Sequence, residues 1–268
     1  ISLYIKLTPT FERNLQKLNS ADEKSKNKDK LTNLIARTVC KDNEEKAFFK
    51  FTSNMIKKER TFKLRVYPSL GFSIIFPFIM LFASGSNRSI SEMSSVNRFF
   101  ALYFISFMLP SILGFISYSG HYKGAWIYQT LPIKNRGFIY KGAVKAVFIN
   151  LFTPVYIVIG LIFLLIFKSK IALDLIIVYL NLLLLSTIVF RIQKIDLPFS
   201  LAFETTGGKN GLGELLLTIM VLGILFGLHY GSTRIIYGGY IFMFILLITN
   251  MISWKYTFNF KEENYGNV

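Results

Sequence analysis

The chain has 268 residues, of which 52% are hydrophobic and 16% aromatic, and it carries a formal net charge of +16. A soluble domain of this length rarely combines so much apolar mass with so much charge, so the composition excludes an ordinary soluble fold and places the apolar residues in lipid. Sixteen of the 31 Lys and Arg precede Val66, and the aromatic residues after it lie in apolar blocks rather than between charges, which argues against a nucleic-acid partner.

Residues 1–42 form a polar, basic segment that we expect in the cytoplasm. The stretch over residues 20–30 is almost wholly polar and cannot bury a core, which predicts a mobile surface segment. Cys40 is the only cysteine, so no intramolecular disulfide can form. Its neighbours Arg37 and Lys41 indicate solvated chain in a reducing compartment.

Residues 43–65 are predicted to form a basic amphipathic connecting helix that leads into the first membrane segment. Phe48, Phe51, Met55 and Phe62 recur at near-helical spacing, with lysines and arginines around them. Such a helix can lie at the headgroup level of a membrane, its aromatic face in the acyl boundary and its lysines on anionic lipid. The alternative is a solvated helix that packs on a partner protein.

Six apolar blocks follow, and the first of them, at 1.5 Å per residue, matches the roughly 30 Å core of a bilayer. Backbone groups in lipid must be satisfied within the segment, so blocks of this length predict helices. Pro68 and Pro77 are expected to start and to kink the first helix. The blocks cover residues 66–84, 99–118, 144–167, 171–190, 215–230 and 235–254.

Two of the connections between these blocks are very short. Only residues 168–170 separate the third block from the fourth, and residues 231–234 separate the fifth from the sixth. Each pair is therefore expected to form a tight helical hairpin. The sequence as a whole predicts an all-α polytopic membrane protein, with about six transmembrane helices over residues 66–254 preceded by the amphipathic interfacial helix.

The distribution of basic residues predicts which side of the membrane each connection faces. If the N-terminus is cytoplasmic, all but five of the 31 Lys and Arg lie on the inner side, the five being Arg88, Arg98, Lys168, Lys170 and Arg234. The positive-inside rule favours this orientation. We therefore expect a multi-pass protein of the cell membrane, with cytoplasmic termini and a cytoplasmic tail over residues 255–268.

Few ionisable residues fall at membrane depth, where they are costly and usually functional. Asp174 lies in the first turn of the fourth block and Glu214 at the inner start of the fifth, and we interpret both as boundary residues rather than as a proton relay. His121 and His229 fall on opposite sides of the membrane, which argues against a metal cluster with Cys40, and His229 is expected at an interface. The residues therefore predict no catalytic group, no metal site and no cofactor of the chain's own.

A glycine-rich stretch over residues 207–211 fails as a phosphate-binding loop. A nucleotide P-loop needs four residues between its glycines and a Lys followed by Ser or Thr. Here Lys209 follows a glycine pair and precedes Asn210. We interpret the stretch as a flexible cytoplasmic connector, so that any ATP used by the protein must bind another subunit.

The inner connection over residues 120–145 carries a short motif. Its centre combines an apolar and aromatic patch that includes Trp126, a turn at Leu131 and Pro132, and a basic helix start at Arg136. Such an element suits docking in a groove of another protein, and Trp and Arg are common anchors of interfaces. The alternative is an interfacial loop with an aromatic belt residue.

The residues Ala-Trp-Ile-Tyr-Gln-Thr-Leu-Pro-Ile-Lys-Asn-Arg at positions 125–136, followed by Lys141, resemble the loop after the second helix in ABC-2 type transporter permeases. In that family a Leu-Pro-Ile or Leu-Pro-Val turn, then a basic residue and a Lys, forms the cytoplasmic element that touches the ATPase. Residues 60–71, Arg-Thr-Phe-Lys-Leu-Arg-Val-Tyr-Pro-Ser-Leu-Gly, look like the entry to the first helix in an ABC exporter branch of Gram-positive bacteria.

The resemblance implies that the chain is the permease component of an ATP-binding cassette exporter. It implies a separate cytosolic ATPase that binds the ATP, and a second permease unit or half that completes the export path. It points to Trp126, Leu131, Pro132 and Arg136 for coupling to the ATPase, and to Lys141 for anchoring the following helix at the membrane surface. The chain departs from many relatives in its short connector between the fifth and sixth helices, where they place re-entrant helices.

The fifth block carries Gly223, Gly227 and Gly231 at every fourth position, which lets a neighbouring helix approach closely. We expect this packing within one six-helix unit rather than at a dimer seam. Two other functions stay open, a membrane-embedded enzyme that acts on lipid or peptide and a structural membrane protein. The first of these is disfavoured because the predicted helices carry no evident polar catalytic group.

Overall fold

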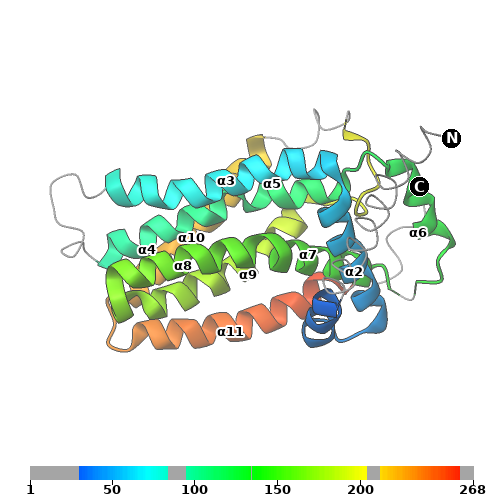
Figure 1. The fold of residues 1–268 in the computed structure, drawn as a ribbon. Helices are drawn as coiled ribbons and strands as arrows, with labels where there is room; N and C mark the ends of the chain where they lie inside the picture. The colour runs from blue at the N-terminus through cyan, green and yellow to red at the C-terminus, as the bar shows by residue number, and fades with distance from the viewer. Residues whose placement is uncertain (1–29, 84–94, 134, 204–211, 260–268) are drawn as a thin grey trace, which may run out of the picture.

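The computed structural model describes residues 30–83, 95–133, 135–203 and 212–259. These ranges are mostly helical, and the one extended pairing within them is an isolated parallel bridge between Tyr118 and Leu201. Long helices lie side by side in one bundle, while α2 (Asn43–Lys58), α6 (Ile127–Thr130) and the start of α7 (Gly137–Val147) gather at one end of it (Figure 1). The expected all-α architecture is confirmed.

Four helical stretches of the described chain are long and apolar enough to cross a membrane, namely Arg60–Ala83, Phe99–Ser117, Gly137–Gln193 and Gly238–Thr257. A shorter apolar helix covers Leu216–Ser232. Many outward-facing side chains on these helices are large and apolar, such as Leu165, which is 83% exposed, and Met251, which is 76% exposed. A helix that is apolar on its outer face as well as its inner face is typical of a membrane span.

The first predicted hairpin is present between α8 (Thr153–Phe167) and α9 (Ala172–Gln193). The chain reverses at the 3-10 turn η6 (Lys168–Ile171), where Lys168 adopts a φ of 57°. The two helices then run antiparallel, and the Tyr156 hydroxyl donates a hydrogen bond to the Leu175 carbonyl at 2.6 Å.

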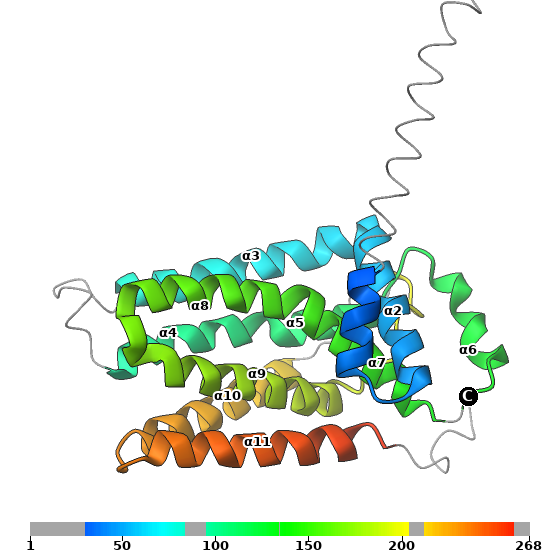
Figure 2. The same cartoon turned by 60° about the horizontal axis from the view of Figure 1, so that its bottom comes forward.

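The second predicted hairpin joins α10 (Leu212–Ser232) to α11 (Gly238–Thr257). The expected start of the last helix at Ile235 is wrong by three residues. Tyr237 adopts a φ of 59°, which belongs to the left-handed region, so the regular helix can begin only at the next residue. Both hairpin turns lie at the end of the bundle opposite α2 and α6 (Figure 2).

The expected helix over residues 43–65 is wrong in its extent, because the chain breaks at Glu59. α2 ends at Lys58, Glu59 is extended with ψ at 113°, and α3 begins at Arg60 and runs to Ala83. Residues 60–65 therefore belong to the first long helix. Pro68 does not start that helix, as the sequence suggested, but lies inside it together with Pro77.

Two further prolines coincide with local changes of helix type. The second long stretch begins with α4 (Ser95–Tyr103), tightens to the 3-10 turn η2 (Phe104–Met108), continues as α5 (Leu109–Gly114) and ends in the 3-10 turn η3 (Phe115–Ser117). Pro110 lies just after η2, and Pro154 just after the π-helical turn η5 (Phe148–Phe152) that joins α7 to α8. Proline lacks an N–H and crowds the carbonyl four residues earlier, so it disturbs the regular hydrogen-bond ladder, and at these two points the helix type changes directly before the proline.

The N-terminal part of the described chain packs on the bundle. Residues 30–39 are helical, and Ala36 and Cys40 are buried in a small apolar cluster with Phe49 of α2 and Ala146 of α7. The solvated environment expected for Cys40 is therefore wrong. Residues 1–29, the glycine-rich stretch at 207–211 and residues 260–268 of the expected tail lie outside the described residues.

Candidate functional site

The segment that the sequence singled out projects from the end of the bundle where α2 lies (Figure 2). Its described part consists of the 3-10 turn η4 (Tyr122–Trp126), α6 and the non-helical residues 131–133, 135 and 136. The Trp126 side chain is 62% exposed and that of Leu131 43% exposed, and Pro132 and Arg136 are exposed beside them in the sequence. We call residues 126–136 the docking segment.

A buried aromatic residue, Tyr128, attaches the docking segment to the bundle. Tyr128 stacks on Phe48 of α2 with ring centroids 6.1 Å apart, and its hydroxyl donates to the Pro198 carbonyl at 3.0 Å. Burial raises the pKa of the Tyr128 hydroxyl well above its ordinary value, so this donor keeps its proton. The exposed apolar side chains of the segment are thus presented on a base that is fixed to two other parts of the chain.

The C-terminal boundary of the docking segment is fixed by a glycine. The Asn135 side-chain oxygen accepts a hydrogen bond from the Gly137 N–H at 2.7 Å, which starts α7. A Cβ atom at Gly137 would lie only 1.8 Å from the Phe258 carbonyl oxygen. The end of α11 therefore packs against the backbone of Gly137, and no larger residue fits there without moving it.

Lys141 does not lie with the docking segment. Its Nζ atom lies 3.5 Å from Oε2 of Glu45, a fully buried carboxylate of α2, and Lys145 forms a second ion pair with the same residue. The two lysines lie on one face of α7 because they are four residues apart. Gly142 lies between them, and a Cβ atom there would lie 2.7 Å from the Glu45 carbonyl oxygen, so α2 crosses α7 in direct backbone contact.

The sequence suggested that α2 lies either at the headgroup level of a membrane or on a partner protein. Its buried face packs instead on α7 of the same chain. Phe49, Thr52, Ser53 and Ile56 point into this chain, together with Glu45. Phe51 stays 39% exposed on the outer side. Glu45, Thr52 and Ser53 are polar although they are buried. The spacing of the aromatic residues alone therefore did not reveal which face of α2 contacts α7.

The break between α2 and α3 is occupied by a second buried carboxylate, Glu59. Its Oε1 atom accepts hydrogen bonds from the Ser119 hydroxyl at 2.8 Å and from the Gly120 N–H at 2.5 Å. Backbone bonds extend this contact, since the Ser119 N–H donates to Leu201 and the Leu201 N–H donates to Ser117, each at 2.9 Å. The connection that leads into the docking segment is thereby attached to the start of the first long helix.

The three glycines of α10 do not pack as expected. No atom of the described chain lies within 4 Å of a Cβ placed at Gly223, Gly227 or Gly231, beyond their own helix backbone and chain neighbours. All three residues are exposed on the outer face of α10. The expected close approach within one unit is therefore wrong for the described residues, because α10 contacts its neighbours through its other face.

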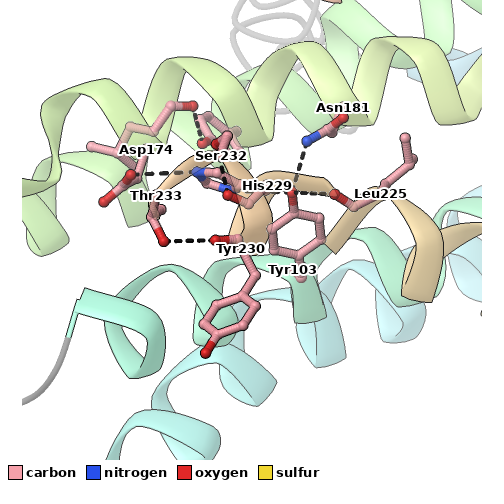
Figure 3. Close-up of polar contacts among 10 residues, drawn as sticks. Tyr103, Asp174, Asn181, Leu225, His229, Tyr230, Ser232 and Thr233 are labelled. Atoms are coloured by element: carbon pink, nitrogen blue, oxygen red, sulfur yellow. Dashed lines mark hydrogen bonds and ion pairs between the residues drawn. The ribbon is translucent and has the colours of Figure 1, made fainter. Parts of the chain in front are cut away.

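A buried polar cluster joins α4, α9 and α10 near the hairpin turns (Figure 3). His229, in the last turn of α10, is fully buried, and its Nε2 atom lies 3.4 Å from Oδ1 of Asp174 in the first turn of α9. Its Nδ1 atom lies 3.2 Å from the Tyr103 hydroxyl, which also accepts a hydrogen bond from Asn181 at 2.7 Å. His229, which was expected at an interface, is thus enclosed by the bundle at the hairpin end of α10.

Sequence reasoning missed Glu45, Glu59 and the contact between His229 and Asp174. The partners of each come from elements far away along the chain, and no local spacing relates them. The one available signal was that Asp174 and His229 fall at the ends of neighbouring hairpins that face the same side of the membrane. Comparison with protein-family models, with curated proteins and with solved structures found no match to this chain.

Proposed function

We propose that this chain is the permease component of an ATP-binding cassette exporter, and that a cytosolic ATPase docks on residues 126–136. The observation that carries the proposal is the exposed group of Trp126, Leu131, Pro132 and Arg136 at one end of an apolar bundle. Large aromatic and Arg side chains held on a fixed base are well suited to fill a groove in a partner protein. ATP binds to the partner subunit, and this chain carries out no covalent chemistry.

The contacts at the two ends of α2 support a route by which docking moves the bundle. Glu45 pairs with Lys141 and Lys145 near the start of α2, and Glu59 follows its last residue and binds the connection at Ser119. A displacement of the docking segment is thus transmitted to α7 and to the start of α3. In this proposal Lys141 acts by fixing α2 to α7.

Six segments cross the cell membrane in the proposed topology. They are α3, the stretch from α4 to η3, the stretch from α7 to α8, α9, α10 and α11, with both termini in the cytoplasm. A second permease unit or half completes the path, and the exposed glycine face of α10 is where we place it, because its small residues leave room for a helix at short distance. The substrate passes between the two units.

The topology can be tested with single-cysteine variants. In a Cys40→Ser background, a cysteine at Ser169 and another at Gln129 are labelled with a membrane-impermeant maleimide in intact cells. Both positions are exposed and lie at opposite ends of the bundle. The proposal expects labelling at residue 169 only, and labelling of both or of residue 129 alone contradicts it.

The docking proposal is tested by isolating the tagged chain from its native membranes and measuring ATP hydrolysis in the preparation. We expect an ATP-binding cassette ATPase to co-purify, and Leu131→Asp with Arg136→Glu to remove it while membrane insertion is retained. Ile236→Asp with Arg234→Glu is the matched control, since it places the same charges on exposed residues of the opposite hairpin turn. Co-purification of the ATPase with the first double variant at the wild-type level contradicts the assignment.

The same preparation separates the proposal from the two other functions. A membrane-embedded enzyme would act on lipid or peptide without any ATPase, and a structural protein would show neither activity. If no ATPase accompanies the wild-type chain and ATP hydrolysis stays at background, the exporter proposal is refuted.

A further inference from the structure

The cluster around His229 contains two ionisable side chains that face each other, His229 and Asp174, and only the Asp174 carboxylate is partly exposed. The His229 side chain is fully buried, whereas that of Asp174 keeps 14% of its surface exposed. The Nε2 atom of His229 has no hydrogen-bond partner among the described residues, and Asp174 at 3.4 Å is its nearest charged group. Ionisable side chains inside apolar helix bundles are costly to bury and usually functional, which makes this pair a candidate site.

The hydrogen bonds of the cluster fit a neutral imidazole. Asn181 donates to the Tyr103 oxygen, so the single hydroxyl hydrogen of Tyr103 is free to point at Nδ1 of His229. Nδ1 then accepts, and the ring hydrogen sits on Nε2, facing the carboxylate of Asp174.

The same atoms also fit the protonated ring. An imidazolium donates from both nitrogens, to Asp174 and to the Tyr103 oxygen, which has two lone pairs to accept from His229 and Asn181. The hydroxyl hydrogen of Tyr103 then turns to the Leu225 carbonyl, which lies 3.4 Å away. Tyr103 therefore has an acceptor for its hydrogen in either state, and no helix has to move.

The other groups around the ring leave Asp174 as the only carboxylate facing it from the described elements. α4 contributes the Phe99 ring, whose centroid lies 4.3 Å from that of His229, as well as Tyr103, and α11 contributes the Phe242 ring at 6.0 Å. Arg234, in the turn after α10, donates a hydrogen bond to the hydroxyl of Tyr230 in that helix. Tyr156 of α8 bonds the Leu175 carbonyl, and Lys168 and Lys170 of η6 are exposed.

We propose that Asp174, His229 and Tyr103 form a proton-binding site that exchanges one proton with the water at the hairpin end of the bundle. A proton taken up by Asp174 passes to Nε2 of His229 in the tautomer whose ring hydrogen sits on Nδ1 and donates to the Tyr103 oxygen, and the imidazolium that forms is stabilised by the carboxylate that gave up the proton. The site joins α4, α9 and α10, so its protonation state sets whether these helices are linked by an ion pair or by neutral hydrogen bonds. The inference does not depend on the proposed exporter function.

The test uses nitrogen-15 labelled histidine and solid-state NMR of the chain in lipid bilayers. His229 and His121 are the only histidines, so His121→Gln leaves one imidazole to observe. We expect the Nε2–H tautomer at the alkaline end of a series from about pH 9 to about pH 4, and a single transition to the imidazolium as the pH falls. A ring that stays neutral, or stays charged, over the whole series overturns the proposal.

Two variants separate a proton site from a merely buried histidine. Asp174→Asn keeps the shape of the side chain but removes the charge that faces Nε2, and the imidazolium signal at the half-way pH of the parent is expected to fall. Tyr103→Phe removes the donor to Nδ1 and is expected to give a mixture of the two neutral tautomers. An unchanged titration in Asp174→Asn overturns the proposal. The matched control is His229→Gln, which leaves only the exposed His121 to observe. Its signal must follow the same pH curve whether or not Asp174→Asn is added.

Discussion

The close crossing of α2 over α7 can be tested directly, because the only cysteine of the chain lies in that seam. Cys40 is buried with Phe49 of α2 and Ala146 of α7. Burial, with a smaller contribution from the charge of Glu45, raises the pKa of the Cys40 thiol to about 12. The rate at which a maleimide modifies Cys40 in the folded protein therefore reports how often α2 and the helix over residues 30–39 leave the bundle.

The perturbation is Gly142→Ala. The added methyl group would lie 2.7 Å from the Glu45 carbonyl oxygen and 2.9 Å from the Phe49 nitrogen. These are backbone atoms that cannot rotate away, so the cost falls in the upper part of the range of about 1–3 kcal/mol for overpacking. The gain from replacing glycine inside a helix is about 1 kcal/mol. The seam is thus expected to weaken by about 1–2 kcal/mol.

This loss predicts a measurable change in modification rate. A weakening of 1–2 kcal/mol raises the population of the open seam, and with it the rate of maleimide addition to Cys40, by about 5- to 30-fold. The assay compares the variant with wild type at one pH, where the chemistry of the free thiol is the same. Gly71→Ala is the matched control because a Cβ there meets nothing within 4 Å. An unchanged rate in Gly142→Ala would refute the direct crossing of α2 over α7.

Three further outcomes are expected. Glu59→Gln removes the charged acceptor of Ser119 and is expected to cost about 1.5–3 kcal/mol, which lowers the Tm in detergent by about 3–10 °C; an unchanged Tm contradicts the role of Glu59. Tyr156→Phe removes one bond between α8 and α9 and is expected to lower the Tm by about 1–3 °C, whereas Tyr240→Phe on the exposed face changes nothing. Modification of Cys40 in the folded protein is expected to rise about tenfold per pH unit beyond pH 9, because its pKa is about 12, whereas the unfolded chain levels off near 9.0; a plateau in the folded protein contradicts the raised value.

The raised pKa of the Cys40 thiol also makes the free energy of unfolding depend on pH. The folded state holds the thiol proton of Cys40 more tightly than the unfolded state does, since its pKa is raised from 9.0 to about 12. The contribution of this group to the free energy of unfolding is therefore complete below pH 9 and is lost as the pH rises toward about 12.

The long helices and their hairpins could be predicted because their signal is local. Only Lys168, Ser169 and Lys170 separate two apolar blocks. Because the backbone inside lipid must stay helical, the chain can reverse direction only at this polar break. The break at Glu59 could not be predicted in the same way. The apolar spacing of Met55 and Phe62 continues across it, and the carboxylate at the break is bound by Ser119, which lies far away along the chain.

The docking segment carried a local sequence signal, whereas the buried cluster around His229 did not. Trp126 and Leu131 are exposed, as a turn at Pro132 between an aromatic patch and a helix start suggests, and their docking role stays a prediction. His229 and Asp174 carried no such signal. Each looked like the end of a helix at a membrane interface, and only the packing of α9 beside α10 buries the histidine against the carboxylate.

The two sites lie at opposite ends of the same helices, and α9 is the element that relates them. It starts at the proton-binding cluster with Asp174 and ends on the side of α2, where Arg191 donates to the Tyr256 carbonyl of α11 at 3.0 Å. Most of its residues are buried, and Asn250 of α11 donates to its Leu180 carbonyl at 3.0 Å. A buried helix that is held along its length moves as a rod, so a shift at one end reaches the other only if α10 and α11 move with it. A link between protonation and docking therefore has two routes, one through α9 together with α10 and α11, and one through α3, which is attached to the docking end through Glu59 and packs on α4, the helix that carries Tyr103.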